Sequence, residues 1–153
     1  MFKLENKSTK ACLTLAIIGY QFPDDPQDDW CNLKAIVEHE DQQAELVDPA
    51  IETTELIELL DWFTCLSEGR LPSYSHLNFI EPCISFEFLA VKNGEVKIAV
   101  KLAYELYPNF DSDEFLSSEN VWVMVFELDS TAFQNTIEGI KNTLEKYPVR
   151  GQD

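Results

Sequence analysis

The segment ISFEFLAVKNGEVKIAVKLAYEL, residues 84–106, decides the fold class of this chain. On both sides of its centre, apolar side chains alternate with small or polar ones: Ile84, Phe86 and Phe88, then Val96, Ile98, Val100 and Leu102. A period of two residues places such side chains on one face of a β-strand. The centre carries Asn93-Gly94, the strongest short-range signal for a hairpin with a two-residue turn. The segment therefore predicts two antiparallel strands, over 84–91 and 96–106, the second ended by Tyr107-Pro108.

Other segments carry weaker strand signals. Apolar alternation predicts strands over 11–22, 33–38, 76–80 and 121–128, and a less well-marked one over 42–49 that closes at Pro49. The 121–128 strand has apolar residues on both faces, which predicts a central position in the sheet. Glu81-Pro82 reads as a bend between two strands, because proline removes a hydrogen-bond donor from the sheet. The polar stretch 109–119 is predicted to be a loop.

Two segments have helical periodicity, over 54–68 and 131–146. Thr53 or Thr54 can cap the first helix and Asp129 or Ser130 the second, while Gly69 is a natural stop for the first. Their apolar stripes are, respectively, Leu56, Leu59, Leu60, Phe63 and Leu66, and Ala132, Phe133, Ile137, Ile140 and Leu144. Hairpin-linked strands with two amphipathic helices predict an α+β fold, a mainly antiparallel sheet with the helices packed on it, in a single domain over 1–153.

The charge of this chain is large and uneven. The formal net charge is −17, and residues 20–69 hold 14 acidic residues against the single base Lys34, a local charge of −13. A second stretch, 102–140, has eight acids and no base. Such a surface argues against nucleic acid and anionic membrane as direct partners, because binding them requires cations. It favours a basic protein partner, since complementary fields accelerate encounter.

The acidic loop in YQFPDDPQDDWCNL, residues 20–33, has two readings. A calcium loop places oxygen ligands at alternating positions around a glycine, whereas these aspartates are paired between prolines. We expect instead one edge of an acidic binding face, with Tyr20, Phe22 and Trp30 holding the loop ends against the core. The predicted partner-binding residues are Asp24, Asp25, Asp28, Asp29, Trp30, Glu55, Glu58 and Asp61.

Residues that would carry catalysis or bind a cofactor do not form a recognisable motif. Five scattered glycines build no phosphate loop, and His39 and His76 lack metal-ligand spacing. Cys12, Cys31, Cys65 and Cys83 form no CxxC pair, so we expect reduced thiols in a cytoplasmic protein that needs neither metal nor cofactor. The N-terminal apolar run ends in GYQFP without a signal-peptidase site.

Two alternatives to a protein that binds a protein partner remain open. One is a small-ligand or metal-binding module that uses Glu81 or the aspartate loops. The other is an enzyme of unfamiliar design, in which His76 would meet Cys83 or Glu81 in a deep pocket.

Several fragments, in order along the chain, resemble the WapI family of bacterial immunity proteins. They are GYQFPDDPQDDWCNL (19–33), TTELIELLDWFTCL (53–66), LNFIEPCISFEF (77–88), VKLAYELYPNF (100–110) and LEKYPVRG (144–151). The chain departs from the family pattern at Leu33, where a tryptophan is usual, and at Cys83, where an asparagine is usual.

The resemblance implies a cytosolic antidote that binds a toxin domain and blocks it without catalysis. Members of the family protect a bacterium from the C-terminal toxin domain, often a nuclease, of a WapA-type contact-dependent protein. The resemblance implies that the protein uses no cofactor and that its partner is a basic toxin domain.

Overall fold

The described residues form two antiparallel four-stranded sheets and two long helices, which confirms the predicted α+β class. The computed structural model describes residues 1–110 and 120–151, so most of the loop predicted over 109–119 lies outside the described residues. The first sheet has the order β1-β2-β3-β4 and the second β5-β6-β7-β8. Their bounds are β1 Phe2–Glu5, β2 Cys12–Tyr20, β3 Trp30–His39, β4 Gln42–Glu52, β5 His76–Asn78, β6 Ile84–Lys92, β7 Glu95–Ala103 and β8 Val121–Leu128.

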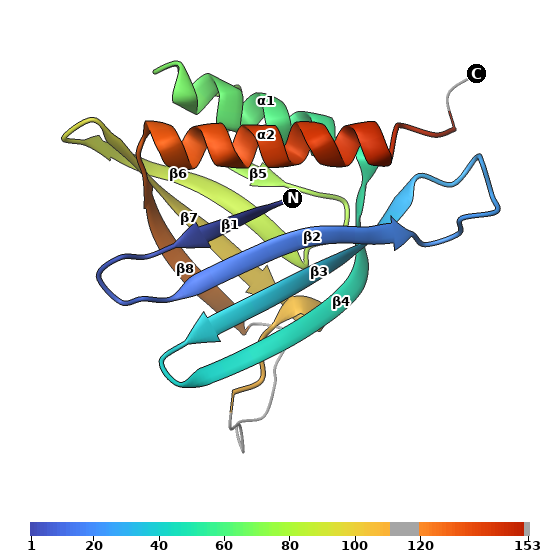
Figure 1. Cartoon of the computed structure of the whole chain (residues 1–153), viewed down its shortest axis with the longest axis horizontal. Coiled ribbons are helices and arrows are strands. Elements are labelled where there is room, and N and C mark those ends of the chain that lie inside the picture. Colours follow the sequence, from blue (N-terminus) through green and yellow to red (C-terminus); the bar gives the residue numbers. More distant parts are fainter. Residues whose placement is uncertain (111–119, 152–153) are drawn as a thin grey trace.

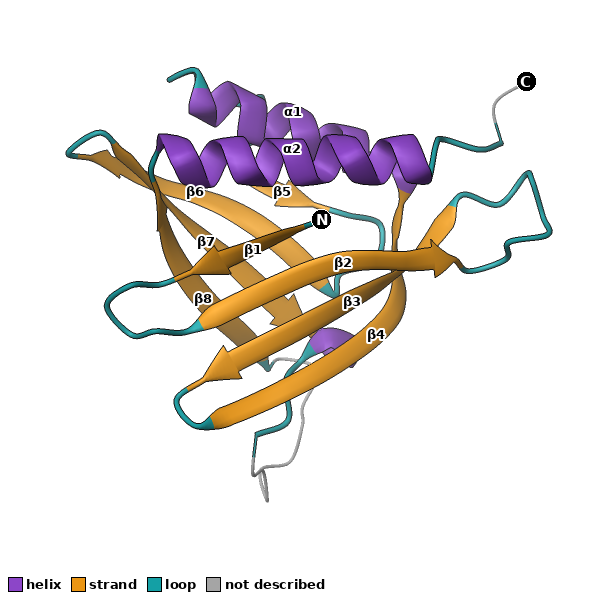
Figure 2. Ribbon diagram, viewed as in Figure 1, coloured by secondary structure: helices purple, strands orange, loops and turns teal. Residues whose placement is uncertain are grey.

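The helices cover one end of the two sheets. Helix α1 spans Thr53–Ser67 and α2 spans Ser130–Lys146, and the two pack against each other. Figure 1 shows β1–β4 and β5–β8 as two separate layers, with both helices across one end and the β3–β4 turn at the other. Figure 2 shows the same arrangement by element type. No helix in the described parts of the chain has the length and hydropathy needed to cross a bilayer.

The hairpin predicted from 84–106 is present. Strands β6 and β7 pair from Ile84–Leu102 to Lys92–Glu95. Asn93 and Gly94 take φ values of 54° and 78°, the left-handed pair that a type I′ turn requires. The second strand ends at Ala103 rather than at Leu106, because Tyr104–Leu106 turn into the short 3-10 helix η1.

Two further strand predictions were wrong in detail. Strand β8 is an edge strand, and Val121 and Val123 face solvent at 47% and 53% exposure, so its second apolar face is not buried. Strand β4 continues through Pro49 to Glu52. Proline is tolerated there because β4 is also an edge strand and because Pro49 and its neighbour together oppose Asn32 in a β-bulge.

The strand at the N-terminus was not predicted. Strand β1 is only four residues long, and it pairs with β2 from Phe2–Leu15 to Glu5–Cys12. Helix α2 lies close to its start: a Cβ on Gly139 would come within 1.7 Å of the Met1 carbonyl oxygen. The glycine within this helix, unfavourable by about 1 kcal/mol relative to alanine, is therefore explained by close packing.

Phe63 of α1 lies at the centre of the core. Its ring is fully buried and makes edge contacts with Phe2 of β1, Phe86 of β6 and Phe133 of α2, at centroid distances of 5.6, 5.8 and 6.5 Å. One side chain thus joins both sheets and both helices. Edge-to-face aromatic pairs contribute about 0.5–1.5 kcal/mol beyond the area they bury.

We predict that Phe63→Ala destabilises the protein by about 3–5 kcal/mol, because it removes these contacts and leaves a cavity. The measurement is the urea midpoint at an unchanged m-value. Leu89→Ala, at a side chain 41% exposed, is the control and should change stability by less than about 0.5 kcal/mol. A loss from Phe63→Ala no larger than that of the control would contradict the central position of this ring.

Candidate interaction surface

The acidic loop between β2 and β3 folds around the side chain of Arg150. The guanidinium donates hydrogen bonds to the carbonyl oxygens of Phe22 and Asp25, both at 3.1 Å, and of Pro23, at 3.0 Å. Its carbon lies 3.5 Å from the centre of the Tyr20 ring, a cation–π contact. The loop is therefore built to hold a cation from the segment that follows α2, which the sequence analysis did not predict.

Asp29 joins this loop to α1 and to the C-terminal segment. Its carboxylate accepts hydrogen bonds from the hydroxyl of Thr53, from the amide of Thr54 at 3.2 Å and from the amide of Arg150 at 2.8 Å. The two threonine amides at the start of α1 lack partners within the helix, so Asp29 serves as a cap supplied from another part of the chain. The Asp29 carboxylate is therefore already engaged in hydrogen bonds within the protein.

The other loop residues divide into internal and outward-facing ones. Asp28 is half-buried and accepts a hydrogen bond from the amide of Trp30 at 3.0 Å. Asp25 is exposed, although one of its oxygens accepts from the amide of Gln27 at 3.0 Å. Asp24 is also exposed, and Trp30 is half-buried. Contrary to expectation, Phe22 does not hold the loop end against the core, since it is 51% exposed.

The three helix acids also have different positions. Glu55 is 5% exposed, and its carboxylate accepts hydrogen bonds from the amides of Glu52, at 3.0 Å, and Ile80, at 2.9 Å. Burial raises the pKa of this carboxyl above its ordinary value, although both hydrogen bonds oppose the rise. Glu58 and Asp61, in contrast, are exposed on the outer side of α1. Glu55 thus positions the helix, whereas Glu58 and Asp61 are available to a partner.

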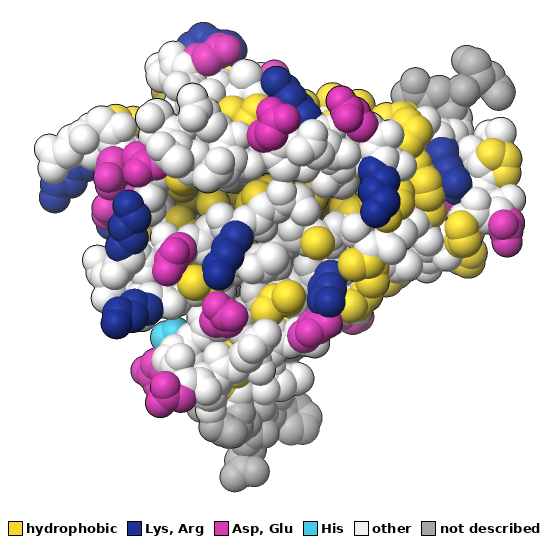
Figure 3. Space-filling view, viewed as in Figure 1, with side chains coloured by type: hydrophobic (Ala, Val, Ile, Leu, Met, Phe, Trp, Pro, Cys, Tyr) yellow, Lys and Arg dark blue, Asp and Glu magenta, His cyan; other side chains and the backbone are white. Residues whose placement is uncertain are grey.

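Two acid-rich segments far apart in sequence are brought together by these contacts. The hydrogen bonds of Asp29 place the loop, which carries the exposed Asp24 and Asp25, beside the start of α1, the helix that carries the exposed Glu58 and Asp61. On the face made by β1–β4 and α2, Figure 3 shows Lys and Arg side chains interspersed with Asp and Glu.

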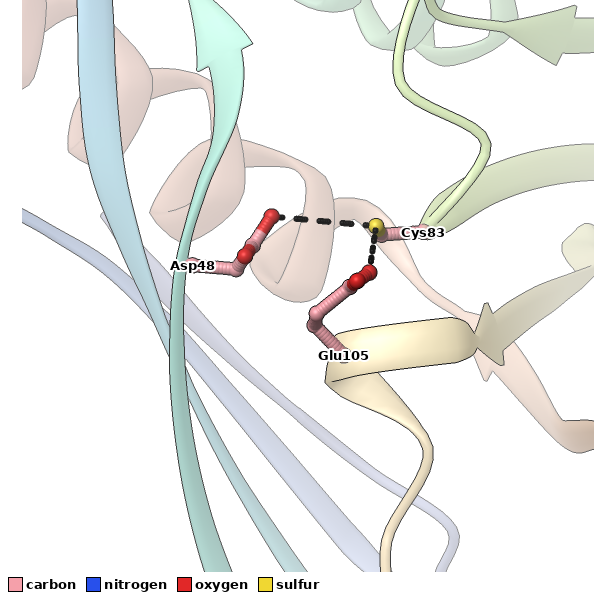
Figure 4. A group of neighbouring side chains, drawn as sticks. All are labelled: Asp48, Cys83 and Glu105. Carbon is pink, nitrogen blue, oxygen red and sulfur yellow. Dashed lines mark hydrogen bonds between the residues drawn. The ribbon is translucent and has the colours of Figure 1, made fainter. Parts of the chain in front are cut away.

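Asp48, Cys83 and Glu105 form a second cluster of polar side chains. They come from β4, from the segment before β6 and from η1, and they point toward one another (Figure 4). The Cys83 sulfur lies 3.3 Å from a Glu105 oxygen and 3.7 Å from an Asp48 oxygen. Because Asp48 belongs to the first sheet and Cys83 lies beside the second, the cluster ties the two sheets together.

The chemistry of this cluster does not favour nucleophilic catalysis. Burial, together with the hydrogen bond to Glu105, raises the pKa of the Cys83 thiol to about 12, whereas a reactive cysteine needs a lowered pKa. Burial, followed by the charge of Glu105, also raises the pKa of Asp48. One sulfur and two carboxylates are ligand types that a divalent ion could use. The Cys83 thiol lies within hydrogen-bonding distance of both carboxylates and can donate its single proton to one of them at a time.

The histidines lie away from Cys83. His76 is exposed, pairs across the sheet with Glu87 and has a ring nitrogen 3.3 Å from the Ser85 hydroxyl. His39 is half-buried with its ring edge-on to Trp122 at 5.2 Å. The catalytic arrangement of His76 with Cys83 therefore receives no support. All four cysteines are free and buried.

Comparison with known proteins gives one match. The sequence model of the immunity protein WapI-like family matches residues 3–148. No curated protein and no solved structure matches the chain.

We predict that Arg150→Ala destabilises the protein by about 1–2 kcal/mol, because it removes charge-assisted hydrogen bonds to three loop carbonyls. Arg150→Lys should recover less than half of this loss, since an ammonium lacks the planar fork that reaches several acceptors. Urea denaturation measures both, with the exposed Lys141→Ala as the control. Equal stability of the alanine variant and the wild type would show that the loop does not depend on the arginine.

We also predict that Cys31 and Cys83 of the native protein resist alkylation at pH 8. A pKa of about 12 at each thiol leaves a thiolate fraction more than about a thousandfold below that of an ordinary cysteine. Mass spectrometry of iodoacetamide-treated protein should find these two positions unmodified without denaturant and modified with it. Rapid labelling of native Cys83 would contradict the thiol–carboxylate arrangement.

Proposed function

This chain belongs to the immunity protein WapI-like family, and from that premise we propose that it binds a cognate toxin domain in the cytoplasm and neutralises it without catalysis. The toxin domain is proposed to be basic, of the kind found in secreted nucleases. Binding occludes the toxin, and the immunity protein performs no reaction on it.

The observation that carries this proposal is the acidic surface along the loop and α1. Asp24, Asp25, Glu58 and Asp61 are exposed on two elements that the Asp29 hydrogen bonds hold side by side. Carboxylates fixed on a rigid frame attract a basic protein over a distance and raise its association rate. The raised pKa values of the thiols and the separation of the histidines from Cys83 support the same proposal, because both favour a binding function over a catalytic one.

We propose that only some of the predicted residues make this contact. Asp29 and Glu55 accept hydrogen bonds from backbone amides and position the loop and helix. Asp24, Asp25, Glu58 and Asp61 then supply the charge that the partner meets. Asp28 and Trp30 lie between these groups, half-buried at the end of the loop.

We expect a large secreted protein to be encoded beside this chain's gene, and the test uses the C-terminal domain of that protein. We predict a one-to-one complex, rescue of growth on co-expression, and an association rate that falls steeply as salt screens the acidic surface. In a titration of toxin activity, inhibition should rise in proportion to the immunity protein and end at one equivalent.

Two outcomes would overturn the proposal. Complete inactivation by about a tenth of an equivalent would indicate an enzyme that turns over, since a stoichiometric inhibitor cannot act beyond its own concentration. Toxin activity that persists at excess immunity protein, with no complex, would exclude neutralisation by binding. A complex whose association rate is the same at low and high salt would exclude the acidic surface as the source of attraction.

A further inference from the structure

A groove runs between α1 and the segment that follows it, residues 71–78. Its floor includes Trp62 and Leu77, which are buried, and its walls include Ile57 and Tyr74, which are 47% and 71% exposed. Its volume is about 350 Å³, at the lower end of the range for small-molecule pockets. The groove therefore has space for a large side chain rather than for an extended cofactor.

Exposed apolar side chains are concentrated along these two segments. Of the twelve large apolar side chains that the described residues expose, three lie here, Ile57, Leu71 and Tyr74, and Ile80 follows just after the second segment. Single exposed apolar residues are ordinary, but a gathering of them marks an interaction site. Tyrosine is also among the residues that most often dominate binding energy at interfaces.

The groove is held rigidly at two points. The indole nitrogen of Trp62 donates to the carbonyl oxygen of Tyr74 at 3.0 Å, and the amide of Ile80 donates to the carboxylate of Glu55 at 2.9 Å. The first bond joins α1 to the facing segment, and the second joins it to the residues just after that segment. Binding to a preformed groove costs less conformational entropy, so a larger share of the contact free energy contributes to the affinity.

The rim of the groove is acidic. Glu58 and Asp61 line it and are exposed, and α1 contains three acids and no base. The next cation along the chain, Arg70, is paired with Glu68 at 2.5 Å. An apolar floor with carboxylates at its edge is complementary to an apolar side chain flanked by lysine or arginine.

We propose that this groove is the anchoring site for the toxin domain, which inserts one large apolar side chain between Ile57 and Tyr74 and places lysine or arginine residues against Glu58 and Asp61. This inference rests on the proposed function and adds the contact surface and the chemistry of the partner segment. The apolar side chain contributes most of the affinity, whereas the flanking cations increase the association rate and fix the register of the partner.

Two variants with matched controls test the apolar and the charged part separately. Tyr74→Ala keeps the carbonyl that Trp62 uses, and should weaken toxin binding at least about tenfold, mostly through faster dissociation. Its control is Val47→Ala, at a side chain 49% exposed on β4. The double variant Glu58→Gln/Asp61→Asn should slow association about threefold or more at low salt.

The charge control removes the same net charge from another place. Glu40→Gln/Asp41→Asn changes two exposed acids in the β3–β4 turn, which lies at the opposite end of the molecule from the helices (Figure 1). It should slow association less than the groove variant does. Thermal melting of each variant, expected to be unchanged, confirms that the fold is intact.

The outcomes separate this inference from the proposed function. If Tyr74→Ala and Glu58→Gln/Asp61→Asn bind and neutralise the toxin as the wild type does, the groove is not the anchoring site, although neutralisation by binding stands. If the two double variants slow association equally and Tyr74→Ala has no effect, long-range attraction alone is at work and the groove proposal fails. If the wild type forms no complex, both proposals fail together.

Discussion

The carboxylate of Asp29 is the interaction on which the arrangement of the proposed binding surface depends. It accepts hydrogen bonds from Thr53 and Thr54 at the start of α1 and from Arg150 after α2. Three segments distant in sequence meet at one side chain. Because a buried or half-buried donor left without an acceptor costs about 1–3 kcal/mol, these partners keep the loop, the helix and the C-terminal segment in fixed relation.

Acidic residues in this protein therefore have two physical roles. Asp29 and Glu55 use their oxygens to satisfy backbone amides, and Asp48 and Glu105 use theirs to meet the Cys83 thiol. Other acids remain exposed and set the field that a partner meets. Some acidic side chains of the chain thus serve internal hydrogen bonding, and only the other, exposed acids are available for recognition.

The same division explains which site residues could be predicted. The sequence pattern identified an acidic loop and an acidic helix face, because solvent-facing carboxylates interrupt apolar periodicity. It could not separate Glu55 from Glu58, since each is followed by a leucine of the same helix, Leu56 and Leu59. Only the opposing backbone of Ile80 buries the first and not the second. The groove beside Tyr74 was likewise not predicted, because its floor and its walls come from different elements.

Local chemistry in the sequence determined the β6–β7 hairpin, both helices and the α+β class. Asn93-Gly94, the Asp129 cap of α2 and apolar periods act within a few residues, so they could be predicted without a structure. The predicted cap of α1 was wrong, because the N-cap is Glu52 and not Thr53 or Thr54. Tertiary structure decided the rest. Strand β8 became an edge, β4 continued through Pro49, and Arg150 entered the acidic loop. The physical reason is that each of these depends on partners far away in the chain, whose identity is set by packing and not by the local pattern.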